Sequence, residues 1–135
     1  IFEDCLQREK PIYLSTIALA EYGVKARIGN LPLQLFRIVP FNIEDAKIAA
    51  RSFDTLKDAH KSKSEAEKAG YSRSLLKDDL KLMAQAVRVG ASHFFTEDER
   101  DFPGIHQVVC QSEKHGPVLV FGRQSLSEIK GELPL

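Results

Sequence analysis

The sequence has little cysteine, no tryptophan, no net charge and no long apolar run. Cys5 and Cys110 are too few and too far apart for a disulfide framework or a cysteine-rich zinc site, and they favour reduced thiols in a cytoplasmic protein. Lys plus Arg equals Asp plus Glu at 19 each, so net charge gives no general attraction to nucleic acid or to an anionic membrane. No apolar run approaches the length of a membrane-spanning helix, so no membrane association is expected.

The chain contains enough apolar residues to form one hydrophobic core. The chain has 135 residues with 43% hydrophobic content, which supports a single domain over residues 1–135. Short apolar runs alternate with segments of helical periodicity. This alternation predicts an α/β fold with a mostly parallel sheet.

The expected elements can be placed from caps, breakers and periodicity. The predicted strands are Pro11–Leu14, Gln34–Val39, Ser92–Phe95, His106–Cys110 and Val118–Phe121. Ser15 or Thr16 is expected to cap a helix that runs to Ile28, and Asn42 is expected to cap a second helix whose buried side includes Ala49. Residues 57–73 are expected to be a partial helix with a flexible tip, Ser74 to cap a helix ending at Gly90, and Ser125–Lys130 to form a short terminal helix.

Two acidic residues occupy positions where helical periodicity asks for an apolar side chain. Glu21 lies in the stripe formed with Ile17, Val24 and Ile28. Asp79 shares a helical face with the apolar residues Leu75, Leu82, Met83 and Ala86. Its neighbour Asp78 lies about 100° around the helix and is expected to face water. A carboxylate on an inward face is costly unless it is paired, hydrogen-bonded or bound to a metal.

A third carboxylate, Asp98, comes directly after the predicted strand Ser92–Phe95. The carboxyl ends of parallel strands are where such sheets bind ligands. Taken singly, each acid has a structural explanation: an ion pair, a helix cap or a solvated turn. Taken together, Glu21, Asp79 and Asp98 predict a site for a divalent metal ion held by carboxylate oxygens.

The same residues resemble the PIN domain family. The segments that carry the resemblance are Leu14 to Tyr22 (LSTIALAEY), Asp79 to Ala86 (DLKLMAQA), and Thr96-Glu97-Asp98 with Phe102 behind it. The resemblance implies a three-layer α/β/α fold and a magnesium- or manganese-dependent ribonuclease. It makes Glu21, Asp79 and Asp98 the catalytic, metal-binding carboxylates and Thr96 a residue that orders the site. Many family members are toxins of toxin–antitoxin pairs, which implies an RNA substrate, a small antitoxin as partner and a homodimer.

The chain departs from the family pattern at its start. Family members open with a strand that carries an Asp and forms the centre of the sheet, and nothing before Pro11 matches it. The residues before Pro11 read as the end of a helix. The domain is therefore predicted to be N-terminally incomplete in this sequence, with a degenerate, inactive member as the alternative.

Substrate contacts are less well defined. Arg73, Lys77 and Arg100 could track phosphates, although acids are interleaved with the basic residues of this region and a solvated surface explains them as well. Two other functions remain open. One is a non-catalytic PIN-like module that binds RNA or protein, and the other is a phosphatase on a doubly wound sheet, for which the expected nucleophilic Asp after the first strand is not visible.

Overall fold

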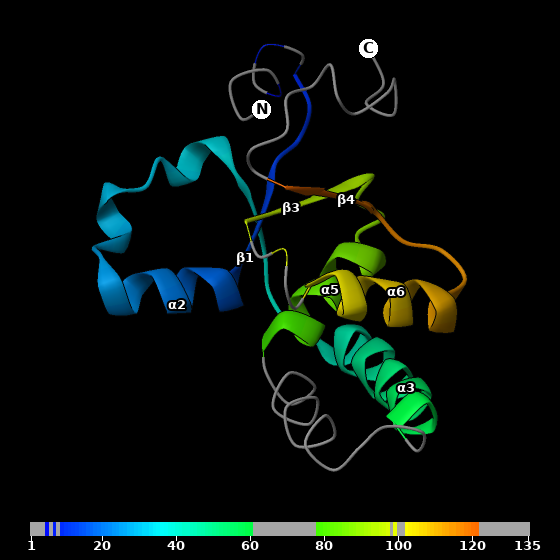
Figure 1. Cartoon of the computed structure of the whole chain (residues 1–135). Coiled ribbons are helices and arrows are strands. Elements are labelled where there is room, and N and C mark those ends of the chain that lie inside the picture. The colour runs from blue at the N-terminus through cyan, green and yellow to red at the C-terminus, as the bar shows by residue number, and fades with distance from the viewer. Residues whose placement is uncertain are drawn as a thin grey trace.

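The computed structural model describes residues 9–60, 78–97 and 102–121, together with Cys5, Gln7 and Glu99. Helices and short parallel strands make up this part of the chain, which confirms the mixed α/β class (Figure 1). The elements in chain order are β1 (Tyr13–Ser15), α2 (Thr16–Lys25), the 3-10 helices η1 (Ile28–Asn30) and η2 (Leu33–Leu35), β2 (Arg37–Val39), α3 (Ile43–His60), α5 (Asp78–Arg88), β3 (His93–Thr96), α6 (Phe102–Glu113) and β4 (Val118–Phe121).

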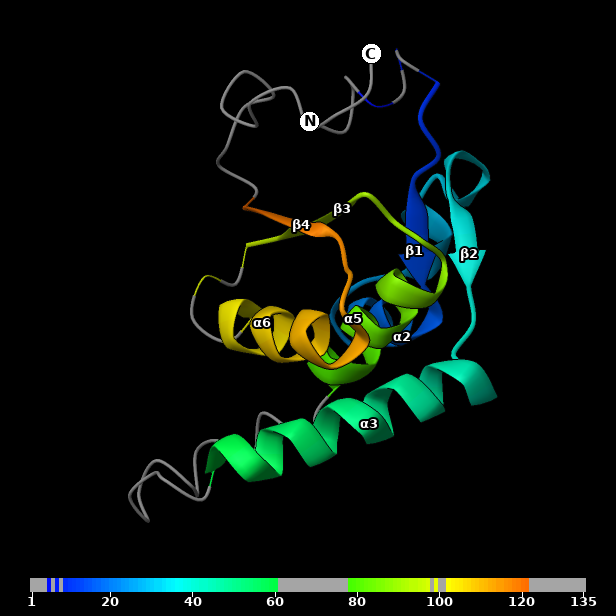
Figure 2. The same ribbon diagram turned by 90° about the vertical axis from the view of Figure 1, so that its right-hand side faces the viewer.

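The four strands form two separate parallel pairs. β1 pairs with β2 and places Ser15 opposite Val39, while β3 pairs with β4 and places Thr96 opposite Phe121. Within the described residues these pairs are two sheets of two strands, and not one central sheet. Figure 2 shows β3 and β4 above α5 and α6, with α3 beneath those two helices and with β1 and β2 running steeply at one side.

The core lies where α3, α5 and α6 meet. Leu80, Met83 and Val87 of α5 pack against Ile105 and Val109 of α6. Met83 and Val109 are completely buried. Complete burial of a side chain of this size contributes about 1.5–3 kcal/mol, so these three helices stabilise the domain more than the short strands do.

The first turn of α3 has a well-formed cap, as the sequence predicts. The side chain of Asn42 accepts hydrogen bonds from the backbone N–H groups of Glu44 at 3.0 Å and Asp45 at 3.1 Å. The Asp45 carboxylate accepts in return from the backbone N–H of Asn42 at 2.9 Å. This reciprocal pair satisfies N–H groups that a helix start otherwise leaves unbonded.

The end of α5 also follows the prediction. Gly90 has a φ of 68°, in the left-handed region that glycine adopts without a steric penalty. The backbone N–H of Ala91 donates to the carbonyl of Ala86 at 3.0 Å, and that of Gly90 donates to the carbonyl of Val87 at 3.1 Å. This pattern is a Schellman motif, and it turns the chain toward β3.

One predicted strand is wrong. His106–Cys110 belongs to helix α6, whose buried residues Phe102, Ile105, Val108 and Val109 repeat with helical spacing. The predicted helix Ser125–Lys130, the cap at Ser74 and residues 61–73 of the expected partial helix lie outside the described residues.

Candidate metal site and adjoining cavity

Ser15 fixes the start of the helix that carries Glu21. Its hydroxyl oxygen accepts a hydrogen bond from the backbone N–H of Ile17 at 3.0 Å, so Ser15, and not Thr16, is the N-cap of the two candidates in the sequence. The same hydroxyl donates to the side-chain carbonyl of Gln85 on α5. Ser15 is the last residue of β1 and the N-cap of α2, and its hydrogen bond to Gln85 connects both elements to α5.

The expected burial of the Glu21 stripe is wrong for the chain as described. No residue of α2 is buried, and Val24 is 85% exposed. Glu21 itself is exposed. Helix α2 is rich in apolar residues, but none of its side chains is buried by the other described residues.

Glu21 nevertheless meets two carboxylates of α5. Partial burial raises the pKa of Glu21, and side-chain hydrogen bonding with Asp78 raises it further. The negative charges of Asp78 and Asp79 add to this effect, and Lys25 opposes it. The structure thus brings together Glu21 and Asp79, two of the three acids that the sequence singles out, from helices more than fifty residues apart in sequence.

Asp78 faces water in part, as its position on the helix predicts, and it also lies near Glu21. Besides bonding to Glu21, it forms an ion pair with Lys81 at 3.7 Å, and its side chain is 44% exposed. Both Asp78 and Asp79 lie in the first turn of α5, where the helix dipole favours negative charge. Asp78 therefore belongs to the acid cluster, which we define as Glu21, Asp78 and Asp79.

The acid cluster has the right chemistry for a hard cation, because all its donors are carboxylate oxygens. The three side chains are not placed to hold one metal ion together. Within the part of the chain that the structure describes, no group of three or more His, Cys, Asp or Glu residues has such a placement. Asp98, the third predicted ligand, lies outside the described residues. The predicted substrate residues Arg73, Lys77 and Arg100 lie outside them too.

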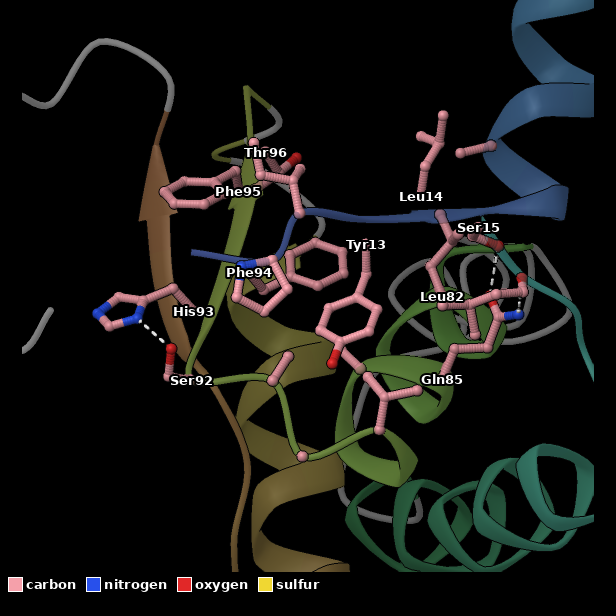
Figure 3. A pocket seen from close by; sticks show the side chains of 18 of the residues that line it. Tyr13, Leu14, Ser15, Leu82, Gln85, Ser92, His93, Phe94, Phe95 and Thr96 are labelled. Atoms are coloured by element: carbon pink, nitrogen blue, oxygen red, sulfur yellow. Dashed lines mark hydrogen bonds between the residues drawn. The ribbon is translucent and has the colours of Figure 1, made fainter. Parts of the chain in front are cut away.

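Thr96 is the last residue of β3 and is half-buried. It lines a cavity of about 720 Å³ that lies between β1 and β3. Figure 3 shows Tyr13, Leu14 and Ser15 on one side of this cavity and the β3 residues on another. Thr96 therefore lies at the carboxyl end of its strand, where the sequence places it, and it also belongs to the cavity wall.

Sequence reasoning missed this cavity and the buried Gln85 beside it. Gln85 is 3% exposed, and its amide nitrogen donates to the carbonyl of Val39 at 3.1 Å. A signal was present, because Gln85 lies in an otherwise apolar helical stripe with Leu82, Ala86 and Val89. The test that selects Asp79 would have selected Gln85 as well.

Comparison with known proteins gives no match: no family model, curated protein or solved structure is similar to this chain. Among the helices within the described residues, none combines the length and the apolar character needed to cross a membrane.

Proposed function

We propose that this protein is a metal-dependent endoribonuclease of the PIN type, with a three-layer α/β/α fold around a mostly parallel central sheet. The observation that carries the proposal is the acid cluster. Helices α2 and α5 bring Glu21 near Asp78 and Asp79, and the pKa of Glu21 is raised first by partial burial and then by these two acids. Like charges are rarely gathered without a compensating cation.

The roles of the residues follow from their chemistry. Glu21, Asp79 and Asp98 would hold Mg²⁺ or Mn²⁺, and the negative charge of Asp78 beside Glu21 would add to the attraction for the cation. When bound, the cation supplies positive charge that lowers the pKa of an attacking water and stabilises the leaving oxygen of a phosphodiester. Thr96, at the end of β3, would order the site. Arg73, Lys77 and Arg100 would contact RNA phosphates.

The biological setting is part of the same proposal. We infer a cytoplasmic toxin of a toxin–antitoxin pair that acts on RNA as a homodimer. A small antitoxin would block the acid cluster.

The test is RNA cleavage by the protein with every residue that its gene encodes, with and without Mn²⁺. Asp79→Asn and Asp98→Asn should each abolish the Mn²⁺-stimulated cleavage while the melting temperature stays near that of the parent. Asp54→Asn is the matched control, because Asp54 is an exposed α3 residue outside the acid cluster. Unchanged cleavage in Asp98→Asn would remove the site assignment.

A second function is a non-catalytic PIN-like module that binds RNA or protein. It is consistent with the exposure of Glu21, which lies on a helix with no buried residue. Retained RNA binding with no cleavage at any Mn²⁺ concentration would select this alternative. Cleavage that depends on Asp98 would exclude it.

A further inference from the structure

Two lysine side chains bring positive charge to the acid cluster. The ammonium nitrogen of Lys81, one turn after Asp78 on α5, lies 3.7 Å from the Asp78 carboxylate. Lys25 follows Glu21 by one turn on α2, and its charge acts on Glu21. The carboxylates of the cluster therefore have positive charges beside them that belong to the protein itself.

Helix geometry fixes both lysines relative to the acids. Side chains three or four residues apart lie on one face of a helix, and an acid that precedes a lysine at this spacing is the favourable order. Asp78 precedes Lys81 by three residues, and Glu21 precedes Lys25 by four. Lys25 also lies in the last turn of α2, where the helix dipole favours positive charge.

Lys81 has a second contact, with a segment far away in sequence. Its ammonium nitrogen lies 6.0 Å from the centre of the Phe41 ring, and Phe41 lies between β2 and α3 and is half-buried. The electron-rich face of an aromatic ring attracts a cation at this distance. Lys81 is therefore held from two sides, by the carboxylate of Asp78 and by the ring of Phe41.

The electrostatics of Glu21 show that lysine charge opposes the repulsion between the acids. Partial burial raises the pKa of Glu21 most, Asp78 and Asp79 raise it further, and the charge of Lys25 lowers it. A positive charge that eases the crowding of carboxylates in this way also repels a cation that approaches them. The lysines and a divalent cation therefore compete for the same negative charge.

We propose that Lys81 is the built-in counter-ion of the acid cluster, and that a divalent cation binding to the cluster displaces its ammonium group from Asp78. Lys81 is thus a positioning residue that sets how tightly the cluster binds a cation. Lys25 acts in the same direction from α2. The inference rests on the metal site of the nuclease proposal and involves no cleavage step.

Coulomb's law sets the size of the effect. At about 6 Å in water, repulsion between an ammonium group and a divalent cation weakens cation binding by about tenfold. Salt at about 0.15 M reduces this factor to about threefold, and salt at about 1 M brings it below about twofold. Removing the charge of Lys81 should therefore strengthen cation binding, and added salt should make the gain smaller.

The test is calorimetric titration of Mn²⁺ into the full-length protein and its variants. Lys81→Gln should lower the Kd for Mn²⁺ by about threefold to tenfold at low salt, and Lys81→Arg, which keeps the charge, should leave it near that of the parent. Lys47→Gln is the matched control, because Lys47 forms the same kind of pair with Glu44, at 3.2 Å on the surface of α3. Asp79→Asn should weaken Mn²⁺ binding and so identifies the cluster as the site.

The outcomes separate this inference from the nuclease proposal. Mn²⁺ binding that weakens in Asp79→Asn but is the same in Lys81→Gln and Lys47→Gln would overturn the role of Lys81 and leave the metal site in place. No Mn²⁺ binding by the parent, or binding that Asp79→Asn does not weaken, would overturn both.

A second measurement follows the ammonium group directly, without any variant that changes the charge of the cluster. The ¹⁵N signal of the Lys81 side chain, assigned by its loss in Lys81→Arg, should shift when Mg²⁺ is added, and the Lys47 signal should stay where it is. A Lys81 signal that does not move at saturating Mg²⁺ would contradict the displacement.

Discussion

Asp45, in the first turn of α3, is completely buried and forms an ion pair with Arg88 in the last turn of α5. Arg88 also donates to the carbonyl of Pro40 at 3.2 Å. The pair therefore joins the end of the β2 segment to two of the three core helices. A buried carboxylate of this kind is tolerated because its charge and its hydrogen bonds are matched.

The first prediction concerns this pair. Asp45→Asn leaves the partly exposed Arg88 guanidinium without its charge partner, so the free energy of unfolding should fall by about 1–3 kcal/mol. Urea denaturation followed by circular dichroism measures it. Glu44→Gln is the control, because Glu44 pairs with Lys47 at 3.2 Å on the surface, where such a pair contributes about 0–1 kcal/mol. Equal losses in the two variants would contradict the structural role of Asp45.

The second prediction concerns Ser15 and Gln85. Ser15→Ala removes the cap of α2, which should cost about 0.5–2 kcal/mol. Gln85→Leu leaves the buried carbonyl of Val39 without its donor and should cost about 1–3 kcal/mol. Because the two side chains bond to each other, the double variant should lose less stability than the sum of the single losses. Strict additivity in thermal or urea unfolding would show that the two side chains do not interact.

The third prediction is a pH dependence in the metal-free protein. The pKa of Glu21 is raised by partial burial, by hydrogen bonding with Asp78 and by the charges of Asp78 and Asp79. Its contribution to folding stability is therefore present below the ordinary value of 4.5 and is lost as pH rises through the raised pKa. Glu21→Gln, which carries no charge, should accordingly gain stability relative to the parent as pH rises from 4 toward 7.

Melting temperatures of the parent and of Glu21→Gln, measured with a chelator between pH 4 and pH 7, test this prediction. A second set of measurements adds Mn²⁺. The parent should be stabilised by Mn²⁺ at neutral pH, and Glu21→Gln should respond less, because ligand binding stabilises only a state that binds it. If the stability difference between the parent and Glu21→Gln does not change with pH, the raised pKa of Glu21 is contradicted.

The fourth prediction concerns the turn between α6 and β4. A Cβ atom added at Gly116 would lie 2.3 Å from the sulfur of Cys110, so Gly116→Ala should destabilise the protein by about 1–3 kcal/mol through overpacking. Cys110→Ala removes the obstructing sulfur. The double variant should therefore recover part of the loss in a urea titration. No loss in Gly116→Ala would mean that the turn relaxes without cost.

Local signals accounted for much of the helical framework. The caps at Ser15 and Asn42, the glycine end at Gly90 and the strand before Thr96 depend on neighbours within a few residues, so the sequence alone predicts them. The segment His106–Cys110 is wrongly predicted as a strand because a short apolar run fits a buried strand and a buried helix equally well. Extending the window to Phe102, with Pro103 in the first turn, gives the helical spacing of α6.

The remaining features depend on partners far away in sequence. The buried Asp45 carboxylate is paired with Arg88, which lies 43 residues later in the sequence. No pattern in the residues near Asp45 predicts this ion pair. Asp78 joins the acid cluster because α2 approaches the start of α5, so helical phase alone assigns it to solvent. The charge of Asp79 acts on Glu21 across the two helices, while a metal site formed by Glu21, Asp79 and Asp98 stays a prediction.

The hydrogen bonds of Ser15 have a consequence for the whole molecule. Ser15 lines the cavity and also holds the first turn of α2, on which Glu21 lies about one and a half turns later. A change in the wall of the cavity at Ser15 therefore also acts on the orientation of Glu21. Because coupling between two sites is reciprocal, cation binding at Glu21 would change the occupancy of the cavity by the same factor.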